Sequence, residues 1–403
     1  MNELEQYLAR AAGKAEVQAG DEITVRVDLV IAHDVTGPMA VEQFMKIGAK
    51  QVFDQKKVVF VLDHNIPAAT VEARELHNSL REFSQRYNTV LYDKGLGVIH
   101  QVIAEKHPLP RGAIIVGADS HTCTAGAYGC IAIAVGATDL AATMATGVIE
   151  IEIPETYEIC LEGKMNPGVY AKDVILYLIG NFGTGRFTDQ AVIFTGSGVA
   201  GLSLEEKMTI SNMGIEMGAM ITYFSELDSV GPVKESYVFD LGEIPPSVAC
   251  PYSPGNVVPV QQVSGTEISQ VVIGSCTNGR LSDMEIAVDV LRGKKVHPDV
   301  TLIIVPASQK VAQEMEDRGL TAELRKAGAI ITSPGCGPCF GAHLGLLAAD
   351  DVAVSTTNRN FPGRMGAKEA KVYLASPRIA AESAVAGKIV APGTVEPLLE
   401  RRN

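Results

Sequence analysis

Six short apolar runs, each followed at once by small and polar residues, recur along this chain of 403 residues. The runs are VVFVLDHN, GAIIVGADSHT, VVIGSCTNGR, VTLIIVPAS, GAIITSPGCGPC and DVAVSTTNRNFPGR. Unbroken Val, Ile and Leu are typical of strands buried on both faces of a sheet. Helical patterns lie between the runs, and this alternation predicts α/β domains with largely parallel sheets.

The bulk composition excludes several classes of protein. The net charge is −13 and no basic cluster is present, which argues against a nucleic-acid partner. The least charged run, 128–148, contains three glycines and Asp139, so we expect a buried helix there and no membrane span. Seven cysteines in a chain that starts with a charged helix, and not a signal peptide, indicate a reducing cytoplasm.

Three cysteines follow two of the predicted strands. Cys336 and Cys339 share a C-x-x-C turn, and Cys276 follows another strand, so their thiolates can converge. Iron–sulfur clusters usually take four cysteines, and three would leave one iron open. A dithiol redox pair or a structural zinc site fits a lone C-x-x-C as well. A fourth ligand could come from any of the other four cysteines, which are Cys123, Cys130, Cys160 and Cys250. For Cys123 and Cys130, packing as small apolar side chains is expected instead.

Histidines and carboxylates also collect at strand ends. His64 follows Asp63 directly, and His121 lies two residues after Asp119. A carboxylate beside an imidazole fixes its tautomer and raises its pKa, as a general acid requires. One such pair is weak evidence, because surface and capping roles are about as common, but two pairs at strand ends favour catalysis. His33, in VIAHDVTGP, is a candidate for a third position of this kind.

Two arginines, Arg359 and Arg364, lie within six residues in a loop bent by glycine and proline. Arginine binds carboxylates through two parallel hydrogen bonds, so this pair suits a dicarboxylate or tricarboxylate substrate. Surface salt bridges are the alternative.

The middle and the C-terminal third show two further signals. Ser203 and Glu206 form a capping box, which predicts a helix that starts there and places Asn212 and Glu216 on one face. The segment 242–260 contains five prolines and is expected to be an extended linker into a last domain. Ser376 and Ser383 lie in a segment that is typical of a helix packed on a sheet.

Seven motifs in order resemble the aconitase superfamily over nearly the whole chain: DHN, GVIHQV, GADSHT, NMGIEMGA, GSCTNGR, CGPC and NRNFPGR. The chain is most similar to the branch of 3-isopropylmalate dehydratase and homoaconitase large subunits, whose enzymes are split into two chains. The resemblance implies three α/β domains, at 1–150, 151–240 and 241–403, around a central iron–sulfur cleft.

The resemblance also implies roles for residues. It implies a 4Fe–4S cluster held by Cys276, Cys336 and Cys339, and a leaving hydroxyl protonated by Asp63 and His64. The further residues that it implies are His100 paired with Asp119, His121 paired with Glu216, Asn212 and Asn358 near the cluster, and Ser120, Arg359 and Arg364 near the substrate.

The expected activity is that of a cytoplasmic hydro-lyase acting on a hydroxy dicarboxylic acid, with 3-isopropylmalate as the first candidate substrate. Homoaconitate, citraconate and dimethylmalate are alternatives. The base, a serine on a swivelling domain, is expected on a small partner subunit in a heterodimer or heterotetramer, since no such domain follows the last predicted helix. The non-catalytic alternatives are an iron-responsive RNA-binding protein, which the net charge disfavours, and a zinc-stabilised protein.

Overall fold

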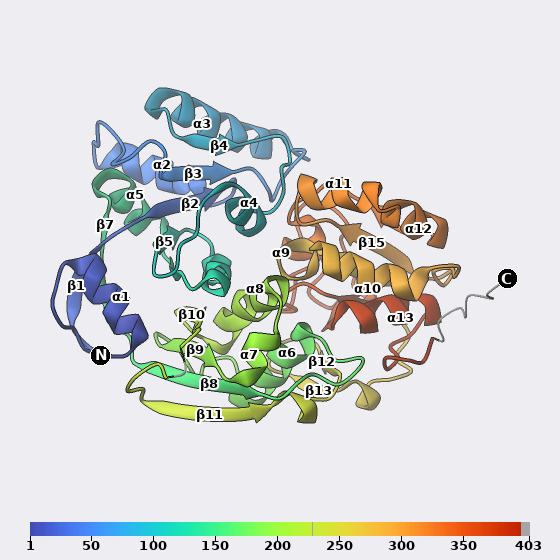
Figure 1. Cartoon of the computed structure of the whole chain (residues 1–403). Coiled ribbons are helices and arrows are strands. Elements are labelled where there is room, and N and C mark those ends of the chain that lie inside the picture. Colours follow the sequence, from blue (N-terminus) through green and yellow to red (C-terminus); the bar gives the residue numbers. More distant parts are fainter. Residues whose placement is uncertain (228, 396–403) are drawn as a thin grey trace. The chain divides into compact units, whose positions relative to one another are not determined.

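The computed structural model (Figure 1) describes residues 1–227 and 229–395. These residues form two compact units. Unit 1 contains Met1–Lys94, Ile99–Lys164 and Thr184–Glu243. Unit 2 contains Gly95–Val98, Met165–Gly183 and the described residues from Ile244 onward. Among the helices of the described ranges, none is both long and apolar enough to cross a membrane.

The first sheet of unit 1 has five parallel strands in the order β4-β3-β2-β5-β6. The strands β2, β3 and β5 are buried along their whole length, as their unbroken apolar sequence predicts. The strands are β2 (Leu29–His33), β3 (Val58–Val61), β4 (Val90–Tyr92), β5 (Ile114–Gly117) and β6 (Ile131–Ala134). Their connections contain α2 (Gly37–Lys46), α3 (Val71–Tyr87), α4 (Ile99–Lys106), η1 (Ser120–Tyr128) and, after β6, α5 (Ala137–Thr146).

The longest helix, α3, has clear local signals at both ends. The Thr70 hydroxyl accepts a hydrogen bond from the Ala73 amide at 3.2 Å, and Asn88 ends the helix in the left-handed conformation, with φ at 55°. Buried side chains recur every three or four residues, among them His77 and Phe83, so this helix packs one face on the core of unit 1.

A second sheet of unit 1 has four parallel strands in the order β10-β9-β8-β11. A separate antiparallel ribbon pairs β1 with β7. The strands are β1 (Glu22–Arg26), β7 (Val148–Glu152), β8 (Thr156–Glu162), β9 (Ala191–Thr195), β10 (Ile221–Phe224) and β11 (Glu235–Asp240). The helices that belong with them are α1 (Glu3–Ala12), α7 (Ser197–Gly201), α8 (Leu204–Asn212), η2 (Met213–Met217) and η3 (Leu241–Glu243).

Unit 2 has one seven-stranded sheet in the order β13-β12-β18-β17-β14-β15-β16. The five strands from β18 to β16 are parallel, whereas β12 and β13 join antiparallel at one edge. The strands are β12 (Ser247–Ala249), β13 (Val257–Pro259), β14 (Gln270–Gly274), β15 (Thr301–Val305), β16 (Ile330–Ile331), β17 (Val352–Ser355) and β18 (Lys371–Leu374). The helices are α6 (Ala171–Phe182), η4 (Val260–Gln262), α9 (Ser275–Asn278), α10 (Leu281–Leu291), α11 (Gln309–Asp317), α12 (Leu320–Ala327), η5 (Gly337–Phe340) and α13 (Pro377–Ala386).

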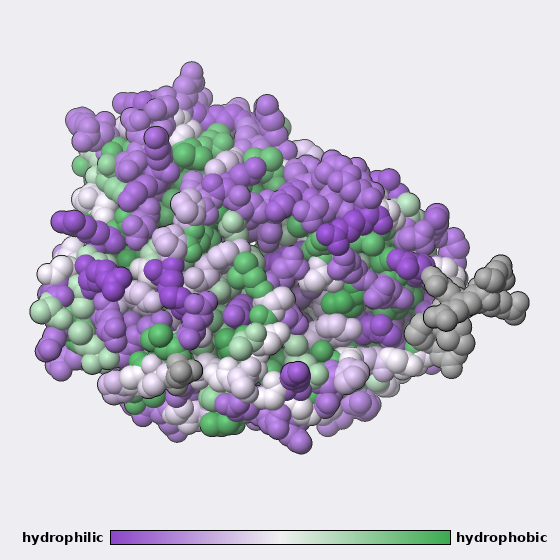
Figure 2. All heavy atoms as spheres, viewed as in Figure 1, coloured by the Kyte–Doolittle hydropathy of each residue, from purple (hydrophilic) through white to green (hydrophobic). Residues whose placement is uncertain are grey.

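The predicted α/β fold with largely parallel sheets is confirmed. All six apolar runs form strands, namely β3, β5, β14, β15, β16 and β17. The helix predicted to hold Ser376 and Ser383 is α13, which begins after Ser376 and buries Ser383. Figure 2 shows mostly hydrophilic side chains on the face in view, as expected for helices that bury one side.

Three local predictions are wrong. The run 128–148 is not one helix, because Gly129 and Gly136 interrupt it and β6 precedes α5. The helix that starts at the Ser203–Glu206 capping box ends at Asn212, so Glu216 lies in the separate 3₁₀ turn η2 and not on the same helical face. The segment 242–260 is not simply a linker, since it contains β12 and β13, which extend the sheet of unit 2. The prolines of this segment lie in loops or turns or in the edge strand β13, where proline is tolerated.

The three-domain division stays a prediction. The two parallel sheets and the β1–β7 ribbon, which come from residues 1–240, lie in unit 1, and the seven-stranded sheet lies in unit 2. Residues 165–183, which we expected in the second domain, belong to unit 2.

Candidate active site

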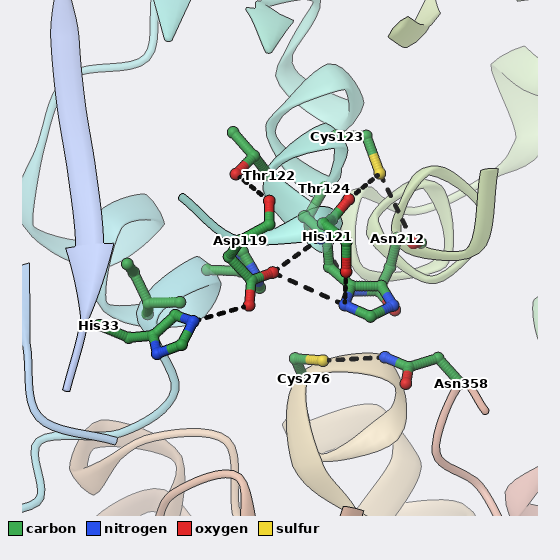
Figure 3. A network of polar contacts seen from close by, with 12 residues as sticks. His33, Asp119, His121, Thr122, Cys123, Thr124, Asn212, Cys276 and Asn358 are labelled. Carbon is green, nitrogen blue, oxygen red and sulfur yellow. Dashed lines mark hydrogen bonds and ion pairs between the residues drawn. The ribbon is translucent and has the colours of Figure 1, made fainter. Parts of the chain in front are cut away.

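Unit 1 carries an imidazole–carboxylate network at the carboxyl ends of three neighbouring strands. His33 ends β2, Asp63 follows β3, and Asp119 follows β5. Because the three strands are parallel and adjacent, their ends place these side chains together. Figure 3 shows Asp119 between the side chains of His33 and His121.

The Asp63–His64 pair is the tightest contact of this network. The Nδ1 atom of His64 lies 2.6 Å from Oδ1 of Asp63, and the Ile99 amide donates to Oδ2 of Asp63 at 2.7 Å. Burial alone would lower the pKa of His64. The charge and hydrogen bond of Asp63, helped by Asp34 and Asp119, outweigh burial and raise the pKa of His64 to about 9. His64 is therefore protonated at neutral pH and can serve as an acid.

Asp34 holds the loop that carries this pair. Its Oδ1 accepts from the amides of Asp63 and His64, at 3.1 and 2.8 Å, and its Oδ2 accepts from the Asn65 amide at 2.8 Å. Nε2 of His77, on α3, lies 3.1 Å from the same Oδ2. Burial would raise the pKa of Asp34, but these donors and the nearby His64 hold it well below its usual value. Sequence reasoning missed Asp34 and His77, although Asp34 directly follows the quoted His33.

Asp119 joins three histidines. Its Oδ1 lies 2.9 Å from Nε2 of His100 and accepts from the His121 amide at 2.7 Å. Its Oδ2 lies 3.2 Å from Nε2 of His33. Burial opposes ionisation, yet His100 and the other donors keep the pKa of Asp119 well below its usual value. The predicted pairing of His100 with Asp119 is thus present in the structure, with His33 on the same carboxylate.

The pairing of His121 with Glu216 is also present. Nε2 of His121 lies 3.2 Å from Oε1 of Glu216, and both side chains are buried. The hydroxyl of Ser120 lies 3.4 Å from Nδ1 of His121. Asn212, also buried, donates from Nδ2 to the Thr124 hydroxyl at 2.9 Å, and its predicted place near a cluster stays a prediction.

One subset of this network has ligand atoms within metal-binding distance of one another. The atoms come from His33, Asp34, Asp63 and His64 and all lie within 4.8 Å. Each oxygen of the two carboxylates already faces an N–H group, as described above. Asp34, which has four N–H partners, has no lone-pair site left for a cation, so the arrangement suits holding a proton.

Unit 2 carries the three cysteines predicted to bind a cluster. Cys276 lies in α9 after β14, and Cys336 and Cys339 lie at the η5 turn after β16. All three are buried. The buried Asn358, after β17, spans two of them: its Nδ2 donates to Sγ of Cys276 at 3.3 Å, and Sγ of Cys339 lies 3.5 Å from its Oδ1. Figure 3 includes the Cys276–Asn358 pair.

Two arginines of unit 2 support the cysteine turns. The guanidinium of Arg280, which is 1% exposed, donates to the carbonyls of Cys276 and Thr277 at 2.8 and 2.7 Å. The turn that it holds contains Ser275 in the left-handed region, with φ at 68°. Nη2 of Arg364 lies 3.6 Å from Sγ of Cys339. Sequence reasoning missed Arg280, although it lies in the quoted GSCTNGR.

These residues fit an iron–sulfur cluster better than a dithiol redox pair. Three buried thiols come from two loops, and an amide and a guanidinium point N–H groups at their sulfur atoms. Hydrogen bonds to sulfur and nearby positive charge stabilise thiolates and cluster sulfur. None of the seven cysteines, all of which lie in the described ranges, forms a disulfide. Cys123 and Cys130 are buried in unit 1, as expected of packing residues.

Comparisons with known proteins agree on one family. The model of the Aconitase family (aconitate hydratase) matches residues 7–230 and 233–387. A "3-isopropylmalate dehydratase large subunit 1" of Methanopyrus kandleri is 43% identical over 96% of this chain and 98% of its own length. A "probable methanogen homoaconitase large subunit" of Methanothermobacter thermautotrophicus is 42% identical over 97% of both chains. The crystal structure of Thermococcus kodakaraensis aconitase X is similar in fold, with a TM-score of 0.56, 12% identity and 90% of each chain covered.

Proposed function

Since this chain belongs to the aconitase family, we propose that it is the large subunit of a hydro-lyase that isomerises a hydroxy dicarboxylic acid by removing and returning water. The observation that carries the proposal is the Asp63–His64 pair at 2.6 Å. Loss of a hydroxyl group as water needs an acid, and a histidine with a pKa of about 9 supplies one at neutral pH.

His64 works through its two ring nitrogens. Asp63 accepts the Nδ1–H group, so the proton that can be given away is the one on Nε2. After the transfer, His64 is neutral and keeps its Nδ1–H bond to Asp63. Asp34 holds the amides of both residues, which fixes the direction of the imidazole during the cycle. The pairs His100–Asp119 and His121–Glu216 are proposed to orient the substrate beside this acid.

Cys276, Cys336 and Cys339 are proposed to hold a 4Fe–4S cluster. When bound, a cluster with one iron free of cysteine supplies a Lewis acid for a hydroxyl group. Asn358 and Arg364 are proposed to stabilise the thiolates through their contacts with sulfur. We propose that Arg359 and Arg364, together with Ser120, bind the carboxylates of the substrate.

We propose 3-isopropylmalate as the substrate and a small subunit as the partner, because relatives with 42–44% identity are named 3-isopropylmalate dehydratase large subunits. The small subunit is proposed to carry a swivelling domain with the serine that removes the carbon-bound proton, in a heterodimer or heterotetramer. Homoaconitate is the second candidate, since one relative at 42% identity carries the homoaconitase name. We place the protein in the cytoplasm, where seven cysteines outside any disulfide stay reduced.

The test is an anaerobic assay of the chain, reconstituted with iron and sulfide and co-expressed with its small subunit. Turnover of 3-isopropylmalate above homoaconitate, citraconate and dimethylmalate supports the proposal. Iron and sulfide are measured on the same sample, because zinc without sulfide would indicate a structural metal site and contradict the cluster.

A further inference from the structure

Lys172 is buried completely in unit 2, at the first turn of α6. Its Nζ donates to the carbonyls of Thr356 and Thr357, at 2.7 and 2.5 Å. These two residues directly precede Asn358, which contacts two of the cluster cysteines. We propose that Lys172 is a positioning residue of the cysteine site, whose ammonium holds the 356–357 turn so that Asn358 reaches both sulfur atoms.

The turn that Lys172 holds is connected to the Cys276 loop as well. The Thr356 hydroxyl accepts from the Gly274 amide at 3.0 Å, two residues before Cys276. The Ser355 hydroxyl lies 2.8 Å from that of Thr357 and accepts from its amide. An asparagine side chain has only two rotatable bonds, so its reach is set by the backbone that bears it. A shift of this turn would therefore move Asn358 away from Cys276 and Cys339.

Packing alone does not explain a lysine at this position. A methionine would fill a similar volume without the free energy needed to bury an ammonium, and a cation near a helix N-terminus opposes the helix dipole. Burial lowers the pKa of Lys172 to about 7, and the charges that favour its ammonium form are, first, those of Cys276 and Cys339. The side chain of the adjacent Asp173 instead accepts from the amides of Ser247 and Tyr170, both at 2.9 Å.

This inference rests on the proposed cluster, but its first test does not require one. In the full chain without iron, Lys172→Met should speed amide hydrogen exchange across residues 355–360. Lys310→Met, the same change at an exposed lysine of unit 2, should leave that exchange at the wild-type rate. Unchanged exchange in Lys172→Met would overturn the proposal, whatever the protein binds.

The second test uses the reconstituted chain with its small subunit. Lys172→Met should weaken iron binding by about 10–100-fold, the range typical of residues that hold metal ligands in place, and should alter the electron paramagnetic resonance spectrum of the reduced cluster. Asn358→Ala should weaken binding similarly. If Lys172 acts through Asn358, adding Lys172→Met to Asn358→Ala should cause little further loss. Losses that multiply would contradict the proposal.

Two further measurements test the proposal even if Lys172→Met does not fold. Lys172→Gln keeps a donor and should lie between wild type and Lys172→Met in iron affinity. In unmodified chain labelled with ¹⁵N-lysine and measured below pH 7, where Lys172 is protonated, one slowly exchanging ammonium signal should shift when iron is removed, and its absence would count against Lys172. A wild-type protein that binds no iron would instead contradict the proposed function.

Discussion

The imidazole of His33 is stacked on that of His64, with ring centroids 4.0 Å apart and planes 20° from parallel. The Val35 amide donates to Nδ1 of His33, so that nitrogen carries no proton and Nε2 carries the one that faces Asp119. A neutral ring therefore lies against the ring that Asp63 keeps charged, which avoids the repulsion of two stacked imidazolium ions.

The first prediction concerns the acid. His64→Ala should lower turnover by about 10²–10⁴-fold, the usual contribution of a general acid, while iron and sulfide content stay at the wild-type level. His297→Ala, which removes a histidine whose side chain is 40% exposed, is the control and should leave turnover unchanged. A loss of less than about threefold in His64→Ala would exclude His64 as the acid, because it lies far below that range.

A second prediction concerns pH. The pKa of His64 rises from 6.5 to about 9 on folding, so its charge stabilises the fold fully below pH 6.5, and this contribution is lost as the pH rises through 9. Asp63→Asn removes the main partner. The difference in unfolding free energy between wild type and Asp63→Asn should be largest near pH 6 and should shrink towards pH 10. Denaturant titrations at several pH values measure it, and a difference independent of pH would contradict the assignment.

The third prediction concerns the cysteines. Cys276→Ser, Cys336→Ser and Cys339→Ser should each lose most of the iron after anaerobic reconstitution. Cys160→Ser, at a half-buried free thiol of unit 1, is the matched control and should keep it. Iron analysis and the visible absorption of the cluster measure the result. Wild-type iron in all three site variants would show that the ligands lie elsewhere.

A fourth prediction concerns Asp34. Asp34→Asn replaces one acceptor oxygen by an N–H₂ group that faces N–H donors, and it removes the charge. Hydrogen bonds to charged groups are worth about 1.5–3 kcal/mol each, so we expect a loss of at least about 2 kcal/mol in unfolding free energy. Turnover should fall too, because the loop of Asp63 and His64 loses its anchor. Asp299→Asn, at a carboxylate whose side chain is 88% exposed, should change neither quantity.

The fifth prediction is that this chain alone turns over 3-isopropylmalate at a small fraction of the rate of the two-subunit enzyme. The physical reason is that dehydration also needs a base, which we assign to the small subunit. Adding that subunit should raise turnover by orders of magnitude, and changing its serine to alanine should remove the gain. Full activity of the purified single chain would contradict the assignment of the base to the small subunit.

The sequence predicted the strands and the residues at their ends because both signals are local. VVFVLDHN and GAIIVGADSHT each contain both a buried strand and the polar side chains that follow it within a few residues. The residues that hold the site residues in place could not be predicted from local sequence. Asp34 lies 29 residues from the Asp63 amide that it binds, and Lys172 lies 184 residues from the Thr356 carbonyl, so only the folded chain brings them together.

The remaining errors also have physical causes. Residues 128–148 are apolar enough for a strand or a helix, and the choice depends on Gly129 and Gly136, which end one element and begin the next. Glu216 reaches His121 from a 3₁₀ turn, whose three-residue repeat differs from the α-helical spacing that we assumed.

The strand order β4-β3-β2-β5-β6 explains why the contact between His33 and Asp119 lies where it does in the sheet. From β2 the chain moves across the sheet in one direction to β3 and β4, and from β5 it moves in the other direction to β6. The connections after β2 and β5 therefore diverge, which makes the ends of these two strands the switch point of the sheet, where open α/β sheets commonly bind ligands. His33 ends β2, Asp119 follows β5, and their 3.2 Å contact joins the two strand ends at this switch point. The location of the acid network is thus a property of the strand order, and loops beyond these strand ends could change in length without displacing it.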